Sequence, residues 1–522
     1  MKRELQIKKI RENNQPWDVV VIGGGATGLG AALEATTRNY RTLLLEMADF
    51  AKGTSSRSTK LVHGGVRYLA QGDISLVLEA LRERGLMRKN APHLVKNQAF
   101  IIPNYEWWGG PFYTVGLKVY DMMAGKLGLG PSVHITKEQV LESLPNIKQE
   151  GLQGGVIYYD GQFDDARLAV NLAQTIVDYN GVVANYVKVV GLTKNETDLV
   201  NGLKVQDMES GDEFTIEARS VINATGVFTD DILQMDEPGS PRRVVPSQGI
   251  HFVLDKEFME GENAIMIPKT DDGRVLFAVP WRGKVVVGTT DTLIDEASLE
   301  PRALESEIDF VLNTAGRYLT RMPKRSDVKS IFAGLRPLAA PEGEGRETKE
   351  ISRGHKISVS LSGLVTITGG KWTTYRKMGE DVINNAALIA GLEERKCITE
   401  NLPLHGYTLA IDRNEHLYVY GSDAVTLKEM MQQNPGLAEK LDERLPFTKA
   451  EVVWAVREEM ARNIDDVLSR RVRALFLDAR AAEAMAPKVA EIMAAELGKD
   501  QKWIDEQISQ FTTQAKGYYL PD

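Results

Sequence analysis

Continuous apolar runs near the start of the chain predict buried strands. Val19–Ile22 and Leu43–Leu45 are runs of this kind, and the stretch after Gly28 that separates them is compatible with a helix. Short apolar runs bounded by turn residues are typical of strands buried on both faces. The pattern predicts a strand–helix–strand unit with parallel strands.

Later parts of the chain follow two other patterns. Between residues 241 and 332, short apolar or alternating runs broken by glycine and proline stand at 249–254, 275–280 and 284–288. They predict antiparallel strands. Beyond about Leu404 the chain is rich in alanine and charge with helical spacing, which predicts a helical domain.

Glycines at 23, 25 and 28 stand between the first predicted strand and the helix. This spacing lets backbone N–H groups approach a pyrophosphate at the positive end of the helix. Glu46 follows the second strand, where a carboxylate binds a ribose diol. The acid argues against a 2′-phosphate, but NAD and FAD both carry the diol. The segment predicts a dinucleotide site.

Three further segments bear on the choice of dinucleotide. Residues 53–69 are dense in glycine, serine and threonine and supply many donors to an extended cofactor, although such clusters are usually flexible loops. Val221–Gly226 is a short apolar strand ending in small residues, and Ile367–Arg376 turns from a strand into a helix that can direct N–H groups at a flavin. Together they favour a flavin.

These segments resemble the FAD-dependent glycerol-3-phosphate dehydrogenases, within the glycine/D-amino-acid oxidase superfamily. The resemblance is carried by the glycine motif, Ser58–Leu69, Asp164–Leu168, Asn223–Gly226, Gly288–Asp291, Gly334–Leu338 and Gly369–Arg376. The runs 60–69 and 369–376 are much more specific than the glycine motif, which many flavoproteins share. The resemblance extends from about Trp17 to Met378, and more loosely to the C-terminus.

The expected fold class is α/β, with a Rossmann-like FAD-binding domain, an inserted antiparallel β-sheet substrate domain and a C-terminal helical domain. The FAD-binding domain is expected to be discontinuous, over residues 17–95, 160–240 and 335–400. The substrate-binding or cap domain is expected at 96–159 and 241–334, and the helical domain at 404–522.

The resemblance implies non-covalent FAD held by residues from all parts of the FAD-binding domain. The expected contacts are Gly23, Gly25, Ala26, Thr27, Gly28, Glu46, Thr54, Ser55, Ser58, Thr59, Lys60, Leu61, His63, Val187, Ala224, Thr225, Gly226, Gly334, Gly370, Lys371, Trp372 and Thr373. His63 is expected beside the flavin ring; a covalent link, as in some other flavoproteins, is the alternative.

A flavin enzyme that oxidises an alcohol must fix the substrate, remove its hydroxyl proton and present its C–H to flavin N5. A phosphate on the substrate calls for guanidinium or ammonium groups, whose charge-assisted hydrogen bonds replace lost hydration. The resemblance places Arg67, Tyr68 and Arg353 at the substrate. The alternatives are a surface arginine beside a core tyrosine, and a loop arginine.

Three more residues are expected near the reacting atoms. Arg336, before a proline in an extended segment, is expected to stabilise the developing alkoxide; a salt bridge between domains is the alternative. Lys371 is expected to favour either the reduced flavin or a substrate oxygen. His251 is the expected base, because imidazole titrates near neutral pH, although a lone histidine on an apolar strand is more often structural.

Composition narrows the functional classes. A length of 522 residues suggests two or three domains. The net charge of −9 argues against nucleic-acid binding. The single cysteine, Cys397, cannot form an internal disulfide and favours a reducing compartment. No signal peptide, membrane-spanning run or metal-ligand spacing is recognised.

Charged and aromatic clusters outside the motifs allow several interpretations. Asp164 and Asp165 precede a predicted helix and are expected to cap it. The basic residues at 470, 471 and 473 are expected on a solvated or inter-domain face. Residues 105–129 combine aromatics with an amphipathic stretch, which suits either an anchor at a membrane surface or a cover for the protein's own core.

The sequence therefore predicts an enzyme that oxidises sn-glycerol 3-phosphate to dihydroxyacetone phosphate by hydride transfer to flavin N5. The resemblance implies that a quinone receives the electrons and that the protein is peripheral, at the inner face of the cytoplasmic membrane. The alternatives are an oxidase that converts O₂ to H₂O₂, an amine or 2-hydroxyacid oxidase of the same superfamily, and a flavin-binding structural or regulatory protein. A homodimer is compatible with the sequence.

Overall fold

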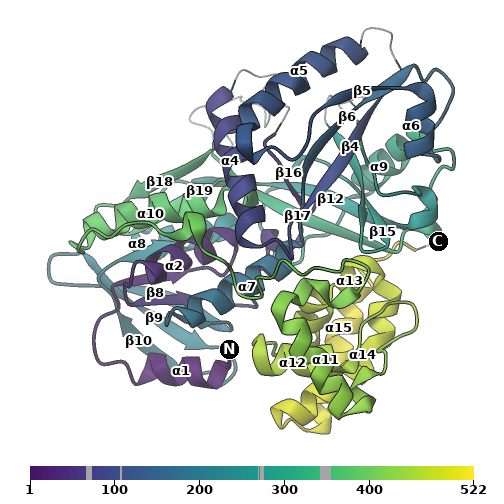
Figure 1. Ribbon diagram of the computed structural model, residues 1–522. Helices are drawn as coiled ribbons and strands as arrows, with labels where there is room; N and C mark the ends of the chain where they lie inside the picture. Colours follow the sequence, from purple (N-terminus) through teal and green to yellow (C-terminus); the bar gives the residue numbers. More distant parts are fainter. Residues whose placement is uncertain (66–72, 106–108, 268–269, 271–274, 341–353, 522) are drawn as a thin grey trace.

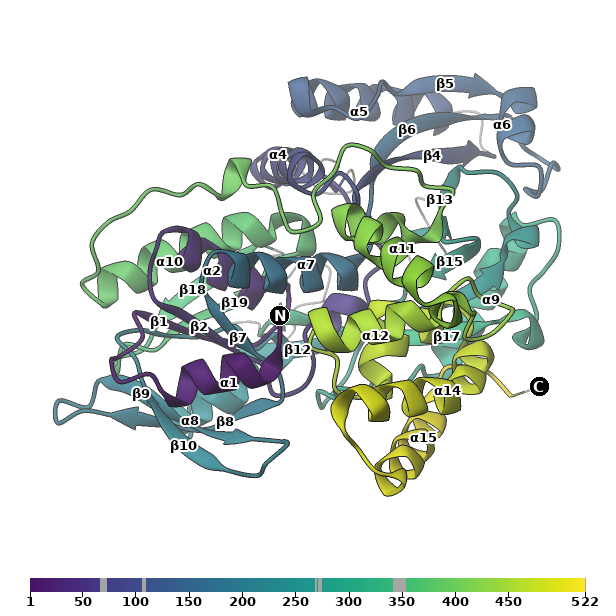
Figure 2. The same cartoon turned by 60° about the horizontal axis from the view of Figure 1, so that its bottom comes forward.

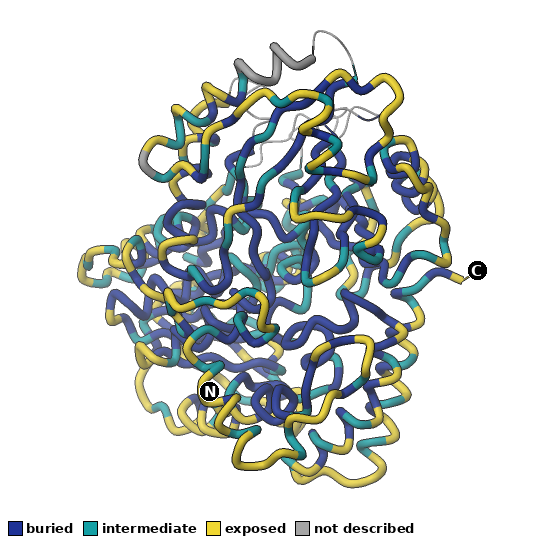
Figure 3. The backbone as a smooth tube through the Cα atoms, turned by 45° about the vertical axis from the view of Figure 1, so that its right-hand side comes forward, coloured by how far each residue is buried: buried dark blue, intermediate teal, exposed yellow. Residues whose placement is uncertain are grey.

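The computed structural model describes residues 1–65, 73–105, 109–267, 270, 275–340 and 354–521. Within these residues, three β-sheets and a group of C-terminal helices form the framework (Figure 1). Buried segments gather where these parts meet, and exposed segments lie on the outside (Figure 3). The predicted α/β fold class, with its antiparallel sheet and C-terminal helical domain, is confirmed.

A six-stranded sheet carries the predicted strand–helix–strand unit. Its strands in spatial order are β18 (His355–Val359), β19 (Val365–Gly369), β11 (Val221–Asn223), β1 (Val19–Ile22), β2 (Thr42–Leu45) and β7 (Val182–Ala184). β1 pairs in parallel with both β2 and β11, and all of its residues are buried. Burial on both faces explains why these strands appear as continuous apolar runs.

Alternate side chains of β1 enter two different cores. Val19 and Val21 face helices α2 (Ala26–Thr37), α7 (Asp165–Asp178) and α10 (Tyr375–Ile389). Val20 and Ile22 face the opposite side of the sheet. That side is covered by a three-stranded antiparallel sheet and two helices: β8 (Val187–Lys194), β9 (Val200–Asp207), β10 (Glu213–Glu217), α1 (Arg3–Arg11) and α8 (Thr229–Asp236). The six-stranded sheet is called here the parallel sheet, although its edge pair β18–β19 is antiparallel. It is the middle of three layers (Figure 2).

A ten-stranded sheet forms the second half of the molecule. Its main path is β16 (Thr292–Leu293), β12 (Val244–Asp255), β15 (Lys284–Gly288), β14 (Leu276–Trp281), β13 (Ala264–Ile267), β4 (Lys96–Asn104), β6 (Gly154–Gln162) and β3 (Leu61–Val62). Two more strands join it from the side: β17 (Ser330–Ala339) pairs with β12, and β5 (Val133–Thr136) with β6. Helices α4 (Ile74–Asn90), α5 (Gly109–Ala124), α6 (Lys137–Ser143) and α9 (Glu305–Tyr318) lie around it (Figure 1).

The predicted strands of this sheet are present, but its composition differs from the expectation in detail. β12, β14 and β15 pair antiparallel as predicted, whereas β13 pairs in parallel with β4. β3 and part of β17 come from segments expected in the FAD-binding domain, yet they pair within this sheet. The structure thus interleaves the two units more than the pattern indicated, and the domain limits stay a prediction.

The C-terminal helices form a compact domain against the ten-stranded sheet. They are α11 (Ala424–Gln433), α12 (Lys449–Glu458), the π-helical turn η11 (Asp466–Arg471), α13 (Ala474–Leu477), α14 (Ala479–Leu497) and α15 (Gln501–Ala515). Their core includes Trp281 and Phe332 of the sheet. The helical spacing predicted beyond Leu404 does not give one continuous helix over residues 451–475, because Met460 and Arg473 adopt left-handed backbone angles. Arg470, Arg471 and Arg473 are not solvated but buried between domains.

Candidate active site

Two adjoining cavities lie where the parallel sheet meets the ten-stranded sheet. The glycine-loop cavity, of about 220 Å³, is lined by the loop after β1 and by segments after β2 and β11. The sheet cavity, of about 340 Å³, is lined by strands β4, β6, β12, β14 and β17. Thr54, Pro337, Gly370, Lys371 and Trp372 line both cavities. An extended ligand can therefore reach from one cavity into the other.

The glycine loop owes its path to close backbone contacts. Gly23 has φ of 110°, and an added Cβ would lie 2.6 Å from the carbonyl oxygen of Ala224. A Cβ on Gly28 would overlap the carbonyl oxygen of Gly23. Gly25 is the N-cap of α2. Because these positions carry no side chain, the backbone at the N-terminus of α2 lies open to the cavity, which suits a pyrophosphate.

Glu46 lies at the edge of the glycine-loop cavity. Its carboxylate accepts hydrogen bonds from the backbone N–H of Gly24, at 2.6 Å, and of Ala48, at 2.8 Å. Burial raises the pKa of Glu46, although the two N–H groups favour its charged form. Each carboxylate oxygen has a second lone pair, so the side chain can still accept a ribose hydroxyl.

The predicted cofactor residues line one or both of the two cavities, except Gly28 and Lys60. Gly28 serves the close packing of α2 on the loop. Lys60 departs from the expectation: its Nζ donates to Asp165 Oδ2 and to the carbonyl oxygen of Ser56, both at 2.7 Å. Burial lowers the pKa of Lys60 to about 7, and Asp165 opposes the shift.

His251 is buried in the wall of the sheet cavity. Its ring stacks on Phe332 of β17, with centroids 5.1 Å apart, and its Nε2 lies 2.9 Å from Thr59 Oγ1. A Cβ on Gly288 would overlap the imidazole, so the neighbouring strand makes room for it. Burial holds the pKa of His251 well below its usual range, and the charges of Lys60 and Arg336 add to the effect. The imidazole is therefore neutral at physiological pH.

Arg336 enters the same cavity from β17. Its guanidinium pairs with Asp291, at 3.3 Å, and donates to Thr289 Oγ1, also at 3.3 Å. A Cβ on Gly249 would overlap the guanidinium. Asp291 belongs to the loop that leads from β15 to β16, so this pair joins two segments of the ten-stranded sheet.

Lys371 lies at the junction of the two cavities. It is the N-cap of the short 3₁₀ helix η7 (Trp372–Thr374), which continues into α10. The two glycines before it have φ of 73° and 79°, values that favour glycine. This turn brings the lysine from the end of β19 to the boundary between the cavities.

Several residues of the sheet cavity escaped prediction. Phe100, Tyr158, Asp160, Met266 and Phe277 line it from four strands. Asp160 accepts from Arg84 and from the hydroxyl of Tyr120, and that hydroxyl in turn accepts from the backbone N–H of Gly64. The five cavity residues are spread over four separate strands of the chain, and so carry no sequence motif.

The three predicted substrate-binding residues, Arg67, Tyr68 and Arg353, lie outside the described residues. Gly65, close before Arg67 in the chain, lines the sheet cavity. Asp164 caps α7 as predicted, because its carboxylate accepts from the backbone N–H of Arg167. Asp165 accepts hydrogen bonds from Lys60 and Arg473. The predicted capping role did not include these two contacts.

Comparison with known proteins identifies the family. The family model "FAD dependent oxidoreductase" matches residues 18–376. A probable mitochondrial glycerol-3-phosphate dehydrogenase of Caenorhabditis elegans is 40% identical over 93% of this chain and 71% of its own length. The chain belongs to the FAD-dependent glycerol-3-phosphate dehydrogenase family. The mitochondrial glycerol-3-phosphate dehydrogenase of Homo sapiens is 38% identical over 97% of this chain and 74% of its own length.

Solved structures agree with this glycerol-3-phosphate dehydrogenase assignment. The glycerol-3-phosphate dehydrogenase from Bacillus halodurans, solved with FAD, is 28% identical, has a TM-score of 0.81 and covers 99% of this chain and 97% of its own. Residues 366–504 match the model "C-terminal domain of alpha-glycerophosphate oxidase". Glycine oxidase from Bacillus cereus, at 18% identity and a TM-score of 0.51, shares the fold over 73% of this chain.

The predicted family, fold class and FAD cofactor are thus confirmed. The glycine-loop cavity fits FAD, because its walls offer glycine backbone where a pyrophosphate is bound and a carboxylate where a ribose is bound. Across the described part of the chain, no helix has both the length and the apolar character needed to cross a membrane.

Proposed function

We propose that this enzyme oxidises sn-glycerol 3-phosphate to dihydroxyacetone phosphate and passes the electrons to a quinone. The observation that carries the proposal is the meeting of His251, Arg336 and Lys371 around one cavity that adjoins the FAD site. When bound, FAD supplies the hydride acceptor, at N5. The protein's own residues must then bind the phosphate, take the hydroxyl proton and keep water out.

His251 takes the hydroxyl proton in this proposal. A base must be neutral before it accepts a proton, and burial keeps this imidazole neutral. The same burial makes His251 a weaker base than the ordinary imidazole that the sequence led us to expect. Its Nε2 contacts the hydroxyl of Thr59, which lines the same cavity. The proton therefore reaches the ring either directly or through that hydroxyl.

Positive charge stabilises the rest of the reacting system. Arg336 lies in the cavity with His251 and favours the developing alkoxide, an effect typically worth a few kcal/mol of barrier. Lys371 acts at the boundary with the FAD site, on the reduced ring or on a substrate oxygen. We assign the phosphate to Arg67, Tyr68 and Arg353. Phe100, Tyr158 and Phe277 supply apolar walls that exclude water.

We also propose peripheral attachment to the inner face of the cytoplasmic membrane, where a quinone is available. Apolar side chains are exposed on two neighbouring helices: Ile74 and Leu78 on α4, and Val119 and Met122 on α5, the last 74% exposed. In Figure 1, α5 lies at the top of the molecule and α4 extends from below it towards the middle. The aromatic residues at 106–108, which strengthened the anchor hypothesis, lie outside the described residues. A homodimer stays a prediction.

A second candidate is an oxidase that uses O₂. It is favoured by the match of residues 366–504 to the C-terminal domain of alpha-glycerophosphate oxidase. Both candidates share the reductive half-reaction and differ in the acceptor, so one experiment can separate them.

The test is anaerobic addition of glycerol 3-phosphate to the purified FAD-bound protein, followed by flavin absorbance. We expect bleaching by this compound and none by glycine, D-alanine or 2-hydroxyglutarate. Rapid reoxidation by a soluble quinone, with slow reoxidation and little H₂O₂ in air, is expected for the dehydrogenase; fast H₂O₂ formation would establish the oxidase. Bound FAD that glycerol 3-phosphate leaves oxidised would contradict both.

A further inference from the structure

A buried carbonyl oxygen beside the two cavities receives hydrogen bonds from two cations. The carbonyl of Ser56 accepts from Lys60 Nζ, at 2.7 Å, and from Arg473 Nη2, at 2.9 Å. Arg473 comes from the C-terminal helical domain, 417 residues further along the chain. Both cations are buried completely. The C-terminal domain thus holds the backbone of a segment that lines the active site.

Asp165 completes this arrangement on the opposite side. Its Oδ2 accepts from Lys60 Nζ, at 2.7 Å, and from both the backbone N–H and the hydroxyl of Ser58, at 3.1 and 2.6 Å. Its Oδ1 accepts from Arg473, at 3.0 Å. Arg473 thus holds the carbonyl oxygen of Ser56, and Asp165 holds the backbone N–H of Ser58. Together they fix the backbone on both sides of Arg57.

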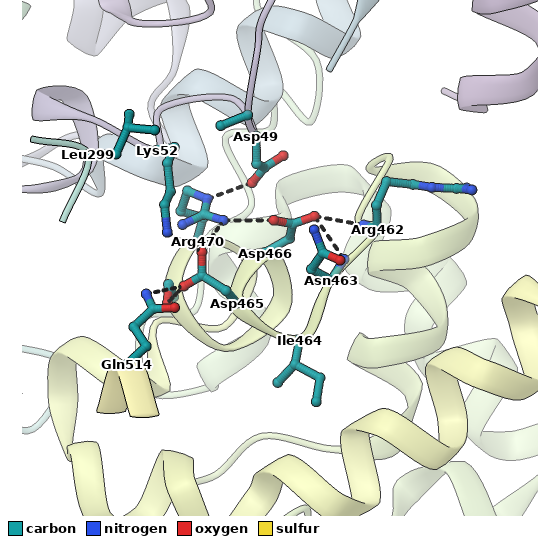
Figure 4. A network of polar contacts seen from close by, with 12 residues as sticks. Asp49, Lys52, Leu299, Arg462, Asn463, Ile464, Asp465, Asp466, Arg470 and Gln514 are labelled. Carbon is teal, nitrogen blue, oxygen red and sulfur yellow. Dashed lines mark hydrogen bonds and ion pairs between the residues drawn. The ribbon is translucent and has the colours of Figure 1, made fainter. Parts of the chain in front are cut away.

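A second set of ion pairs holds the start of the same segment. Asp49 accepts from Arg470, at 2.6 Å (Figure 4), and from Arg471, at 2.7 and 2.9 Å, and all three side chains are buried. Lys52 donates to Asp465, the residue that precedes the turn η11. The C-terminal domain thus contacts residues 49–60, called here the 49–60 segment, at both ends.

The 49–60 segment serves both cavities. Thr54 and Ser55 line the glycine-loop cavity, where Ser55 Oγ accepts from the backbone N–H of Ala26 at the start of α2. Ser58 and Thr59 line the sheet cavity, where Thr59 contacts His251. A shift of this backbone would displace groups at the FAD site and at the proposed base together.

The backbone of Arg473 adds an independent observation. It adopts φ of 71°, which is uncommon for a long side chain. Such a conformation persists only where surrounding contacts hold it. Here the side chain lies over the ring of Phe476, 4.4 Å from its centroid, and bonds Ser56 and Asp165.

We propose that the C-terminal helical domain is a clamp on the 49–60 segment and that Arg473 is its positioning residue, setting FAD affinity and the contact of Thr59 with His251. The FAD part rests on the family assignment. The part that concerns His251 rests on the proposed function.

The test compares Arg473→Lys and Arg473→Met with the matched control Arg457→Met. Arg457 belongs to the same domain but pairs with Glu496 at the surface. We expect Arg473→Lys to fold, since the charge remains, and to lose about tenfold in FAD affinity, because lysine cannot reproduce the guanidinium fork. Flavin reduction by glycerol 3-phosphate should slow by up to about 10²-fold, the size of effect produced by small misplacements. The control should match the wild type in both.

Hydrogen exchange separates a clamp from general destabilisation. In folded Arg473→Lys with FAD removed, the amides of residues 52–60 should exchange faster than in the wild type, while those of β1 and β2 keep their rates. Unchanged FAD affinity together with faster exchange confined to residues 474–515 would overturn the proposal. If Arg473→Met does not fold, the lysine variant still decides. If the wild type is not reduced by glycerol 3-phosphate, the proposed function fails, while the FAD and exchange measurements still test the clamp.

Discussion

Thr59 Oγ1 lies 2.9 Å from Nε2 of His251, although the two residues are 192 positions apart in the chain. Thr59 belongs to the segment that continues from the FAD site, whereas His251 lies on strand β12 of the ten-stranded sheet. The contact ties the proposed base to the FAD-binding side. It also orients the imidazole, whose opposite edge is buried.

Replacement of His251 should remove base catalysis without removing FAD. We expect His251→Gln to bind FAD and to be reduced by glycerol 3-phosphate about 10²–10⁴-fold more slowly, the usual contribution of a general base. Stopped-flow flavin absorbance at pH 7.5 measures this rate. Thr59→Ser keeps the hydroxyl and serves as the control, with a rate close to that of the wild type. A rate within threefold of the wild type in His251→Gln would remove this residue from the mechanism.

Because of His405, the free energy of unfolding should decrease as the pH rises into the alkaline range. Although burial opposes its charge, hydrogen bonds with Asp178 and Asp423 raise the pKa of His405 to about 9. The folded pKa exceeds the unfolded value, so the stabilisation is fully present below about pH 6.5 and is lost as pH rises through 9.

The variant His405→Gln tests this dependence. Its loss should be about 1–2 kcal/mol at pH 6, discounted for the partial exposure of the pair, and close to zero at pH 10. Calorimetric unfolding at both pH values measures the difference. The exposed residue His134 provides the control, His134→Gln, which should show no such trend. An equal loss for His405→Gln at both pH values would contradict the assignment.

The hydroxyl of Tyr120 should stabilise the wall of the sheet cavity. Tyr120→Phe leaves the buried N–H of Gly64 without its acceptor and removes a donor from Asp160. A loss of about 1–3 kcal/mol in the free energy of unfolding is expected, as for other unsatisfied buried groups. We also expect a higher KM for glycerol 3-phosphate, since Asp160 lines the cavity. Steady-state kinetics and thermal unfolding measure the two effects.

Tyr105→Phe is the matched control for Tyr120→Phe. It removes a hydrogen bond from a tyrosine hydroxyl to the carbonyl of Lys148 in a solvent-exposed setting. It should change stability by less than about 1 kcal/mol and leave KM unaltered. Equal effects of the two substitutions would contradict the role given to Tyr120.

Gly28 should be indispensable for FAD binding, although it does not line either cavity. A methyl group there would overlap the carbonyl of Gly23 and push α2 from the loop. We expect Gly28→Ala to be destabilised by about 1–3 kcal/mol and to purify without FAD. Flavin content after denaturation measures this. Gly116→Ala, in open space on α5, should retain full FAD content.

The parts of the site that were predictable depend on local backbone constraints. Gly23, Gly25 and Glu46 stand at positions where one strand–turn–helix unit demands a particular residue type, so their spacing alone identified them. Lys60 belongs to the run 60–69, which is more specific than the glycine motif, yet its side chain points to the buried carboxylate of Asp165. The motif indicated that Lys60 lies near the proposed cofactor site, but not in which direction its side chain points.

The residues that escaped prediction are joined only through space. Asp160 and Tyr120 meet because α5 packs against β6, and no spacing in the chain records that contact. The same holds for Arg470 and Arg471 of η11, which share the partner Asp49 more than four hundred residues earlier in the chain. In a sequence, a run of basic residues is typical of a solvent-exposed face. Only the structure shows which acidic residues neutralise it.

The bond between Arg473 and Ser56 also has a consequence for the order of events during synthesis. Ribosomes extend chains at roughly 5–20 residues per second, so Ser56 precedes its partner by about 20–80 s. The Rossmann-like unit emerges early, but the segment that completes its cofactor site must wait for the carboxyl-terminal helices. On the proposed clamp, we therefore expect FAD to bind only after the carboxyl-terminal helices have been synthesised.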